Sequence, residues 1–404
     1  MFPLTRPLAL VMVGLPARGK TYLSRKLARW LGWQGYRAEV FNVGSYRRDR
    51  VGAEQPAAFF DPGNPLGRAA RESVARAALD DLLAWVGDGG QVAIYDATNS
   101  TRARRRAVAD RLTAAGLDVV FVESICNDPA LVESNIRETK VSSPDYRGQD
   151  AQSAIADFRA RIAHYERAYE PVVEAEGSFV KLIDVGTTVI AHQIRGYLTG
   201  QIATYLANLH PNPRPIWLTR HGESEANPQS RIGGDPDLTA SGQVYAGRLS
   251  TTLASRVTQP PVVWTSTLRR AGATASALPW PAVHLKLLDE IDAGIFDGWT
   301  YGDVGRKAPE EAAARAADKL RYRYPRGESY LDVITRLLPL QVEIERQRAP
   351  VVVVAHNAVI RVLYGFFAGK RQEDVPRLEI PLHTLIRLQP KAYGADEERI
   401  PLGP

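Results

Sequence analysis

The stretch VMVGLPARGKTY, Val11 to Tyr22, carries the strongest fold signal in this sequence. Its second part, Gly14 to Thr21, fits the pattern G-x-x-x-x-G-K-[ST]. The glycines of such a loop let successive backbone N–H groups point inward at phosphate oxygens. Lys20 then reaches the terminal phosphates and the Thr21 hydroxyl binds Mg²⁺. Because the motif follows an apolar run at 8–13 and opens a helical pattern, it predicts a nucleotide site in an α/β domain.

Strand and helix patterns alternate on both sides of this motif. Apolar runs predict strands at 8–13, 39–43, 92–96, 118–126 and 179–185. Helical patterns lie between and after them, at about 14–31, 66–86, 102–116, 158–172 and 191–209. Strands that alternate with helices favour a mostly parallel sheet with helices on its faces.

A proline-rich segment then separates this first series from a second one. HPNPRP, residues 210–215, holds three prolines and predicts a stiff linker. Further strands are expected at 216–219, 261–266 and 350–356, and one of the intervening helices is the alanine-rich 308–320. We therefore expect two domains, 1–209 and 216–404, joined by 210–215. A chain of 404 residues is also too long for one ordinary core.

Composition narrows the classes of partner and compartment. The single cysteine, Cys126, cannot form a disulfide within the chain and indicates a reducing, cytoplasmic environment. The net charge of +6 suits nucleic acid, an anionic membrane or small phosphorylated molecules. No apolar run reaches the roughly 18 residues of a spanning helix. A signal peptide is disfavoured, because the apolar stretch at 8–14 runs into the phosphate loop that cleavage would destroy.

A phosphate loop also needs a carboxylate near the metal, at the end of a neighbouring strand. Asp96 in VAIYDATN offers one, with helix capping as the alternative. Cations for an acceptor occur in YRRDR (46–50), at Arg71 and in the run RARRR. For Arg104 to Arg106 a solvated helix face is an equally good interpretation.

A second chemical motif, LTRHGES, lies at 218–224. Arg220 beside His221 disfavours the imidazolium, so we expect His221 to hold a lone pair at neutral pH. Companions for a phosphate pocket follow along the chain: Arg269, Arg270, Glu290 and His356. Such a set can hold a phosphoryl group, attack it with imidazole and protonate the leaving oxygen. A metal site on the two histidines is the disfavoured alternative, because a cation adjoins His221.

These motifs resemble known families. R-H-G-E with a distant A-H is similar to the histidine phosphatase superfamily, which includes phosphoglycerate mutase and works through phosphohistidine without a metal. With the phosphate loop upstream, the whole chain resembles the bifunctional 6-phosphofructo-2-kinase/fructose-2,6-bisphosphatase family. Ten segments match in order: GLPARGKTY, FNVGSYRRD, DATNSTRARRR, FVESIC, SSPDY, RHGESEAN, RIGGDP, EIDAG, YRYPRGESY and PLHT. The resemblance implies two three-layer α/β/α domains, a P-loop NTPase-type one and a phosphoglycerate mutase-like one.

The resemblance also implies roles for residues of the first domain. ATP would contact Gly14, Ala17, Arg18, Gly19, Lys20, Thr21, Tyr22, Asn135 and Lys140. Asp96 would lie at the transfer centre and hold Mg²⁺ together with Thr21. Fructose 6-phosphate would contact Arg47, Arg48, Arg71, Thr98, Arg161 and Tyr165, with the choice between Arg47 and Arg48 left open.

In the second domain, the resemblance makes His221 the nucleophile and Glu290 the proton donor. Arg220, Arg270 and His356 would clamp the phosphoryl group. The rest of the sugar bisphosphate would contact Asn227, Ile232, Gly233, Tyr301, Arg321, Arg326, Asn357 and Arg361. Two positions depart from the family pattern: Arg326 stands where lysine is expected and Asn357 where glutamine is usual.

The expected function is therefore a cytoplasmic bifunctional enzyme. It would make fructose 2,6-bisphosphate, a signal metabolite of glycolysis and gluconeogenesis, from fructose 6-phosphate and ATP–Mg²⁺, and hydrolyse it again without a cofactor. No nucleic acid or membrane partner is required, and a homodimer is expected by family analogy. Two alternatives stay open: a kinase–phosphatase that acts on another phosphate ester, such as a polynucleotide end, and a non-catalytic sensor of nucleotide and sugar phosphate.

Overall fold

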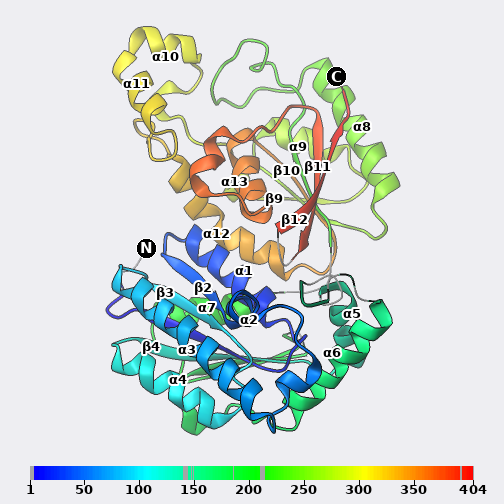
Figure 1. The fold of residues 1–404 in the computed structure, drawn as a ribbon. Helices are drawn as coiled ribbons and strands as arrows, with labels where there is room; N and C mark the ends of the chain where they lie inside the picture. The colour runs from blue at the N-terminus through cyan, green and yellow to red at the C-terminus, as the bar shows by residue number, and fades with distance from the viewer. Residues whose placement is uncertain are drawn as a thin grey trace. The chain divides into compact units, whose positions relative to one another are not determined.

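The computed structural model describes residues 4–139, 144–146, 148, 150–184, 186–209, 214–391 and 394–403. The chain divides into two units, Met1–Leu209 and His210–Pro404. Among the described residues each unit holds one six-stranded sheet, and helices flank both sheets (Figure 1). The expected α/β class is confirmed. No helix in the described part of the chain is long and apolar enough to cross a membrane.

The N-terminal unit is built on a mostly parallel sheet of order β2-β3-β1-β4-β5-β6. Its strands are β1 Leu8–Val13, β2 Ala38–Asn42, β3 Val92–Asp96, β4 Asp118–Ile125, β5 Phe179–Ile183 and β6 Thr188–His192. Its α-helices are α1 Lys20–Trp33, α2 Val43–Val51, α3 Pro65–Gly87, α4 Arg102–Ala114, α5 Pro129–Thr139, α6 Ala151–Glu166 and α7 Tyr197–Asn208.

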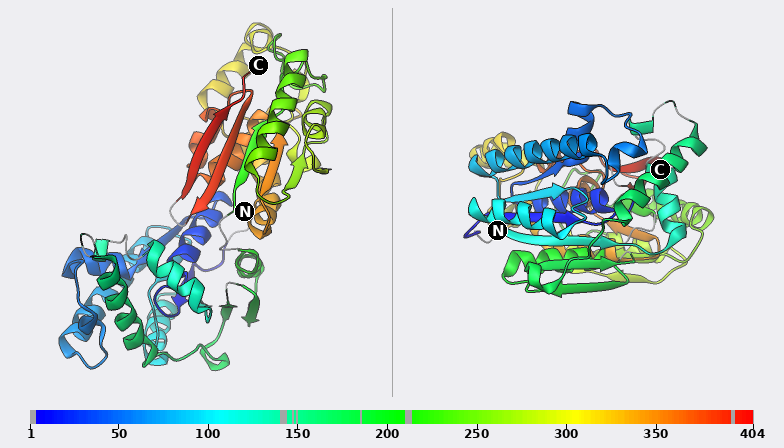
Figure 2. Two further views of the ribbon diagram at one scale, coloured as in Figure 1. Left: turned by 90° about the vertical axis from the view of Figure 1, so that its right-hand side faces the viewer. Right: turned by 60° about the horizontal axis from the view of Figure 1, so that its bottom comes forward.

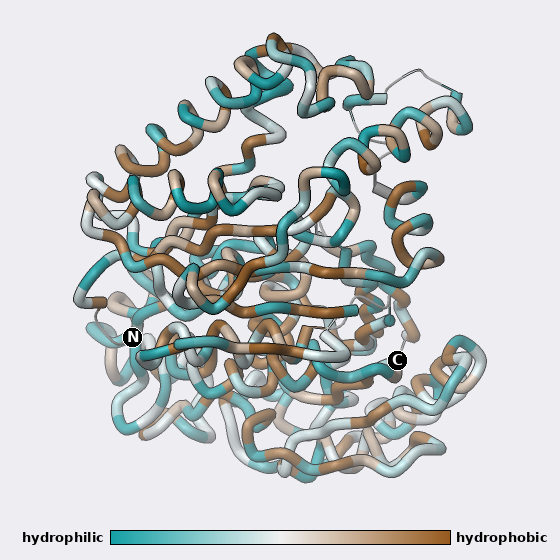
Figure 3. The backbone as a smooth tube through the Cα atoms, turned by 90° about the horizontal axis from the view of Figure 1, so that it is seen from below, coloured by the Kyte–Doolittle hydropathy of each residue, from teal (hydrophilic) through white to brown (hydrophobic). Residues whose placement is uncertain are grey.

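Strand β1 is central and fully buried, as its continuous apolar run requires. Ala9, Val11 and Val13 point to one face of the sheet, where α3 and α4 supply apolar side chains. Helices α1 and α7 meet through Trp30 and Tyr205, whose rings stack at 4.5 Å. The apolar segments coloured brown in Figure 3 include the extended strands of this interior. The phosphate loop therefore leaves the middle of the sheet at its carboxyl edge.

The C-terminal unit has a sheet of order β12-β11-β7-β10-β8-β9. Its strands are β7 Ile216–Arg220, β8 Val262–Thr265, β9 Ala282–His284, β10 Val351–Ala355, β11 Thr384–Lys391 and β12 Gly394–Pro401. Its α-helices are α8 Ala240–Arg256, α9 Arg269–Ser276, α10 Tyr301–Lys307, α11 Pro309–Ala317, α12 Tyr330–Arg346 and α13 Asn357–Phe367. Strands β7, β10, β8 and β9 are parallel, and β11 and β12 form an antiparallel pair at one edge (Figure 2).

Three expectations about elements are corrected. The helix expected over 191–209 begins only at Tyr197, after Gly196 with φ of 95°. The preceding residues form β6, because the β-branched segment 188–190 pairs antiparallel with β5. The strand expected at 39–43 ends at Asn42, whose side chain caps α2. The helix expected over 158–172 is α6 and ends at Glu166.

Two candidate phosphate sites

The phosphate loop leaves β1 through residues with left-handed backbone angles. Gly14, Ala17 and Gly19 have φ of 137°, 59° and 80°. A Cβ on Gly14 would lie 2.4 Å from the carbonyl oxygen of Ser124, so only glycine fits there. The Gly14 N–H donates to the carbonyl of Thr98 at 3.0 Å, which ties the loop to the segment after β3. This backbone curls around the space in front of α1, as a phosphate cradle requires.

Three side chains converge beside this loop. Asn42 and Asp96 are direct partners in the β2–β3 register. The Asn42 amide donates to Asp96 Oδ2 and, at 3.5 Å, to Thr21 Oγ1. The capping alternative for Asp96 is wrong, because Thr101 caps α4. The hydroxyl and the carboxylate thus lie together, and the connecting residue Asn42 was not singled out from the sequence.

The other residues predicted to contact ATP make separate contacts with the protein. Lys20 is buried and donates to the Leu15 carbonyl at 2.6 Å. Asn135 donates to the carbonyl of Ala17 at 3.2 Å. Arg18 forms an ion pair of 3.6 Å with Glu166, and the Tyr22 ring lies 5.6 Å from the Lys26 ammonium. Lys140 lies outside the described residues, so its role stays a prediction.

A second group of cations in the N-terminal unit is organised by one carboxylate. Asp145 lies 2.7 Å from Arg47, 3.8 Å from Arg48 and 3.3 Å from Arg161. The Arg161 guanidinium also lies 3.4 Å from the centroid of the Phe60 ring. Three guanidiniums around one carboxylate leave a net positive cluster that suits an anionic acceptor. The carboxylate was not predicted, because nothing along the sequence links residue 145 to these arginines.

Three other residues were predicted to contact fructose 6-phosphate. Arg71 on α3 donates to the carbonyl of Phe59, and burial lowers the pKa of its guanidinium. Tyr165 on α6 lies 6.2 Å from Phe60 between ring centroids. Thr98 contributes its backbone carbonyl to Gly14, as described above. Their roles toward a ligand stay predictions.

The RARRR run divides between three environments. Arg104 donates to the side chain of Asn99 at 3.1 Å. Arg105 is fully buried and forms two hydrogen bonds of 2.7 and 2.8 Å with Glu176. Arg106 is exposed and pairs with Asp110, one turn along the helix. The solvated-face interpretation therefore holds for Arg106 alone, and Arg105 is a structural residue.

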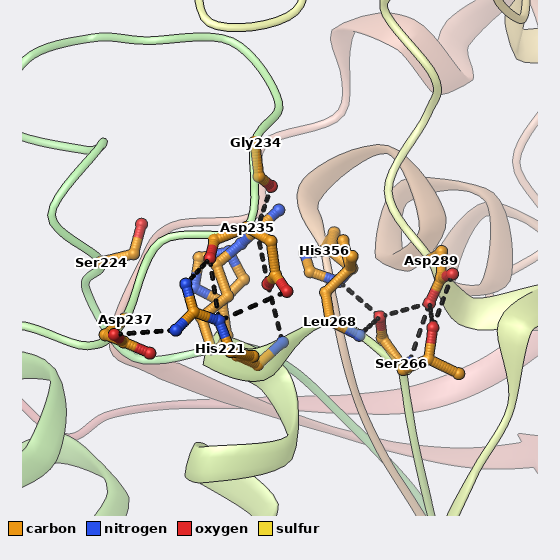
Figure 4. Close-up of polar contacts among 12 residues, drawn as sticks. His221, Ser224, Gly234, Asp235, Asp237, Ser266, Leu268, Asp289 and His356 are labelled. Atoms are coloured by element: carbon orange, nitrogen blue, oxygen red, sulfur yellow. Dashed lines mark hydrogen bonds and ion pairs between the residues drawn. The ribbon is translucent and has the colours of Figure 1, made fainter.

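In the C-terminal unit, parallel register gathers the second set of groups. Arg220 pairs with Ala355 across β7 and β10, and Val354 pairs with Thr265 across β10 and β8. The next residue of each strand therefore emerges at the same carboxyl edge: His221, His356 and Ser266. The His221 and His356 rings lie with centroids 5.0 Å apart (Figure 4).

The hydrogen bonds of His221 define its tautomer. Nδ1 lies 2.7 Å from the carbonyl of Gly222, which only accepts, so Nδ1 carries the proton. The Arg270 Nε–H donates to Nε2 at 3.1 Å, so Nε2 holds the lone pair. Burial and the cations Arg270 and Arg220 lower the pKa of His221 to about 3. The ring is therefore neutral at physiological pH, with the free lone pair that a nucleophile needs.

Of the two arginines around His221, Arg270 is buried and Arg220 is half-buried, and both are fixed by backbone carbonyls. Arg220 donates to the carbonyl of Ile380 at 3.1 Å, and Arg270 to that of Gly234 at 2.7 Å. Burial lowers the pKa of both guanidiniums. Each retains donor groups on its planar fork, which suits the equatorial oxygens of a phosphoryl group.

Glu290 lies at the N-terminus of α13 beside these cations. Oε1 accepts from the N–H groups of Ile291 and Ala358 at 2.9 and 3.1 Å, and Oε2 accepts from Asn357 N at 3.1 Å. Arg336 on α12 donates to the carbonyls of Leu287, Asp289 and Glu290, so it fixes the segment that carries the carboxyl group. Arg336 also pairs with Glu328 at 2.8 Å, and it was missed because it lies outside the quoted motifs.

Comparison with known proteins identifies both units. A family model for 6-phosphofructo-2-kinase matches residues 4–213, and one for the histidine phosphatase superfamily, branch 1, matches 216–400. The 6-phosphofructo-2-kinase/fructose-2,6-bisphosphatase of Caenorhabditis elegans is 45% identical over 403 residues, 96% of this chain and 88% of the relative. The chain belongs to the 6-phosphofructo-2-kinase/fructose-2,6-bisphosphatase family.

Other relatives agree in name and differ in length. The Arabidopsis thaliana 6-phosphofructo-2-kinase/fructose-2,6-bisphosphatase is 48% identical over 98% of this chain, and the chain spans 54% of that relative. The human 6-phosphofructo-2-kinase/fructose-2,6-bisphosphatase 3 is 44% identical, over 98% of this chain and 76% of its own. Among solved structures, the Shigella flexneri α-ribazole phosphatase has 22% identity and a TM-score of 0.42, over 46% of this chain and 96% of its own. The family resemblance expected from the sequence is confirmed.

Arg315 and Lys319, two cations without a family-implied role, lie near Arg361 and form with it a cation strip. Arg315 donates to the hydroxyls of Tyr324 and Tyr301 at 2.8 and 3.0 Å. Burial, Arg361 and Arg315 lower the pKa of Lys319 to about 8. Arg361 also contributes to lowering the pKa of Arg220, so it lies within electrostatic range of both Lys319 and Arg220. Arg315 and Lys319 were missed, because they lie in an alanine-rich helix segment and just after it, without a motif.

The other sugar-site predictions lie in several environments. Arg361 donates to the hydroxyl of Tyr330 at 3.0 Å, and the Tyr301 ring lies 4.4 Å from Arg315. Arg321 is exposed and pairs with Asp318, and Arg326 is exposed at a φ of 61°.

Four further residues were predicted to contact the sugar bisphosphate. Here they have structural contacts within the protein. Asn227 accepts from Ser224 N and Oγ at 2.8 and 2.9 Å. Ile232 is buried in a small core cluster. Gly233 has φ of 69°, and a Cβ there would clash with the Asp297 carboxylate. Asn357 offers its N–H to Glu290 as described above. Contact of any of these with substrate stays a prediction.

The metal alternative at the histidines finds no ligand set. Across the described ranges, no group of three or more His, Cys, Asp and Glu residues could hold a metal ion. At His221 itself, Nδ1 is engaged by the Gly222 carbonyl and Nε2 faces a guanidinium. A cation is therefore disfavoured at that nitrogen.

Proposed function

We propose that this chain phosphorylates fructose 6-phosphate at O2 with ATP–Mg²⁺ and hydrolyses the resulting fructose 2,6-bisphosphate. The names of its relatives support both activities. One observation favours a bisphosphate over other esters: the cations of the C-terminal unit form two linked sets. Arg220 and Arg270 lower the pKa of His221, whereas Arg315 and Lys319 form a second group, and Arg361 is within electrostatic range of both Lys319 and Arg220. A substrate with two phosphates fits such an arrangement.

The kinase activity is assigned to residues 1–209. The amide groups of the phosphate loop and Lys20 would hold the ATP phosphates, and the adjoining Thr21 hydroxyl and Asp96 carboxylate have the oxygen donors that Mg²⁺ prefers. When bound, the ion neutralises charge on the phosphates. The Arg47, Arg48 and Arg161 cluster would hold the sugar phosphate. Such sites act mainly by positioning and by electrostatic stabilisation.

The phosphatase activity is assigned to residues 216–404, after a linker at 210–215. The Nε2 lone pair of His221 would attack the phosphorus at O2, and the P–O2 bond would break. Glu290 would deliver the proton to the departing sugar oxygen. Water would then attack phospho-His221 and release phosphate. Arg220, Arg270 and His356 would stabilise the transferring group, without a cofactor.

Both activities are tested on one purified preparation. Formation of an acid-labile sugar bisphosphate from fructose 6-phosphate and ATP–Mg²⁺, and release of phosphate from fructose 2,6-bisphosphate, are the expected results. Tight, salt-sensitive binding of single-stranded oligonucleotide without these reactions would favour a polynucleotide kinase–phosphatase. Binding of ATP and sugar phosphate without turnover would favour a sensor. We also propose a cytoplasmic location and, by family analogy, a homodimer.

A further inference from the structure

A serine and an aspartate behind His356 form a hydrogen-bonded chain. Nε2 of His356 lies 2.8 Å from Ser266 Oγ, and Ser266 Oγ lies 2.7 Å from Asp289 Oδ1. The backbone N–H of Leu268 donates to the same Ser266 Oγ at 3.0 Å. Figure 4 shows this chain on the side of His356 away from His221. The family resemblance gave Ser266 and Asp289 no role.

The hydrogen bonds of the Ser266 hydroxyl determine the tautomer of His356. A hydroxyl has one donor and two acceptor positions. The Leu268 N–H can only donate, so it fills one acceptor position. Asp289 also receives the N–H of Thr267 at 2.8 Å, and its carboxylate takes the Ser266 proton. The remaining position on Ser266 must accept, so Nε2 of His356 carries the proton.

The other nitrogen of His356 then carries the lone pair. His356 is fully buried, and Nδ1 has no hydrogen-bond partner within the described structure. The ring lies between Ser266 and His221, so Nδ1 lies on the side of the phosphoryl site (Figure 4). A bare lone pair would repel phosphoryl oxygens, whereas an Nδ1–H would donate to one.

The charges around His356 favour the neutral ring until an anion arrives. Arg220 faces it from β7, Arg270 from α9 and Arg336 from α12, and the neutral His221 ring lies beside it. Two carboxylates oppose these cations: Asp289, through Ser266, and Glu290, which binds the N-terminus of α13. Burial, and then the neighbouring arginines, hold the pKa of His356 well below its usual range. A dianion beside Nδ1 would raise it, with Asp289 stabilising the imidazolium from the other side.

We propose that Ser266 and Asp289 are positioning residues that keep the His356 proton on Nε2, and that binding of a phosphoryl dianion takes up one solvent proton at Nδ1. The imidazolium then donates Nδ1–H to a phosphoryl oxygen. On release of phosphate this proton returns to solvent, so the cycle balances. The inference rests on the proposed function for the identity of the anion, whereas the tautomer of the free protein does not depend on it.

The test is nitrogen NMR of the full chain with ¹⁵N-labelled histidine, with His356 assigned by its absence in His356→Gln. In the free protein His356 should show a protonated Nε2 and an unprotonated Nδ1. Inorganic phosphate at about pH 8.5, where it is dianionic, should convert Nδ1 to the protonated form. A proton on Nδ1 in the free protein would overturn the tautomer. An Nδ1 that stays unprotonated at saturating phosphate would overturn the proton uptake.

Three variants distinguish the roles of Ser266 and Asp289 in the hydrogen-bonded chain to His356. Ser266→Ala should release the proton from Nε2 and give mixed tautomers. Asp289→Asn can still accept from Ser266, so it should keep the tautomer and lose the protonation by phosphate. Thr267→Val removes another hydroxyl bound to Asp289 and serves as the matched control with both properties kept. A wild-type spectrum for Ser266→Ala would contradict the proposal.

The same variants should divide kcat from KM in the phosphatase reaction. Ser266→Ala and Asp289→Asn should lower kcat by about 100-fold, the range of a lost proton-donating group, with KM within about threefold. A purely structural role would lower the unfolding temperature and leave kcat unchanged well below it. Equal kcat in folded wild type and Ser266→Ala would therefore also refute the positioning role.

Discussion

The Nε–H of Arg270 donates to Nε2 of His221 at 3.1 Å, so one guanidinium contacts the nitrogen that is to attack phosphorus. The bond orients the lone pair and disfavours a proton on it. When a phosphoryl group approaches, the same guanidinium can pass to a phosphoryl oxygen and leave the lone pair free. Both partners are buried, so the contact is little screened by water.

His221→Ala should remove phosphatase activity and spare the kinase. Loss of the nucleophile should lower the rate of phosphate release by at least about 1,000-fold. It should also prevent labelling of the protein by fructose 2,6-bisphosphate that carries ³²P at C2. Labelling that survives the change would rule out His221 as the nucleophile.

Lys20→Met should have the opposite effect. The ammonium that reaches the ATP phosphates is lost, so synthesis of the bisphosphate should fall by at least about 100-fold. Phosphate release from fructose 2,6-bisphosphate should stay within about twofold of wild type. A folded Lys20→Met protein that has lost both activities would refute separate sites.

Chelation should separate the two activities in the same way. EDTA should stop the kinase, because the Thr21 and Asp96 site is expected to work with Mg²⁺. The phosphatase should continue, because Arg220 and Arg270 supply the positive charge at its phosphoryl site. Added Mg²⁺ should restore the kinase and serves as the control. A phosphatase that stops in EDTA and recovers with a divalent ion would indicate a metal site.

The depressed pKa of His221 should make the fold sensitive to acid. In the folded chain His221 stays neutral down to about pH 3, whereas in the unfolded chain it takes up a proton near its ordinary value of 6.5. The unfolded state therefore binds more protons in this window, and stability is lost as pH falls. Compared with His221→Asn, the wild type should lose about 3 kcal/mol more unfolding free energy between pH 6.5 and 4. Urea denaturation across this range measures it, and parallel curves for the two proteins would contradict the shift.

The cation strip should serve affinity for the second phosphate of the substrate. Arg315→Leu and Lys319→Met should each raise KM for fructose 2,6-bisphosphate about 10- to 100-fold and leave kcat within about threefold, because both lie away from the bond that breaks. Arg306→Ala is the matched control, since Arg306 is exposed and pairs with Asp303. A fall in kcat without a change in KM would place these groups at the reacting phosphate instead.

Local patterns were sufficient for much of the fold. The buried run of β1 and the Gly14–Thr21 loop predict a parallel α/β unit, because a strand, a glycine turn and a helix start are short-range features. The strand β6 was not predicted, and its last two residues, 191 and 192, were included in the expected helix over 191–209. Its partner β5 decides the outcome, and pairing between strands is a tertiary interaction.

Some residues of the candidate sites can also be predicted from local sequence, and others cannot. His221 and His356 are recognisable from their motifs, but their 5.0 Å separation follows from the parallel register of β7 and β10. Asp145 lies in the segment SSPDY but received no role from the resemblance, and Arg315 and Lys319 lie outside the quoted segments. They became candidates only where folding placed them against other charges.

The sequence by itself determined the family, the two α/β units and the residues of both phosphate motifs, because these depend on residue type and short spacing. Only the tertiary structure decided which nitrogen of each site histidine is protonated and which groups it contacts. The His221 lone pair depends on the carbonyl of Gly222 and on Arg270, and the His356 tautomer depends on Ser266, Leu268 and Asp289. A proton's place follows from donors and acceptors that converge from distant segments, and spacing along one chain does not encode that convergence.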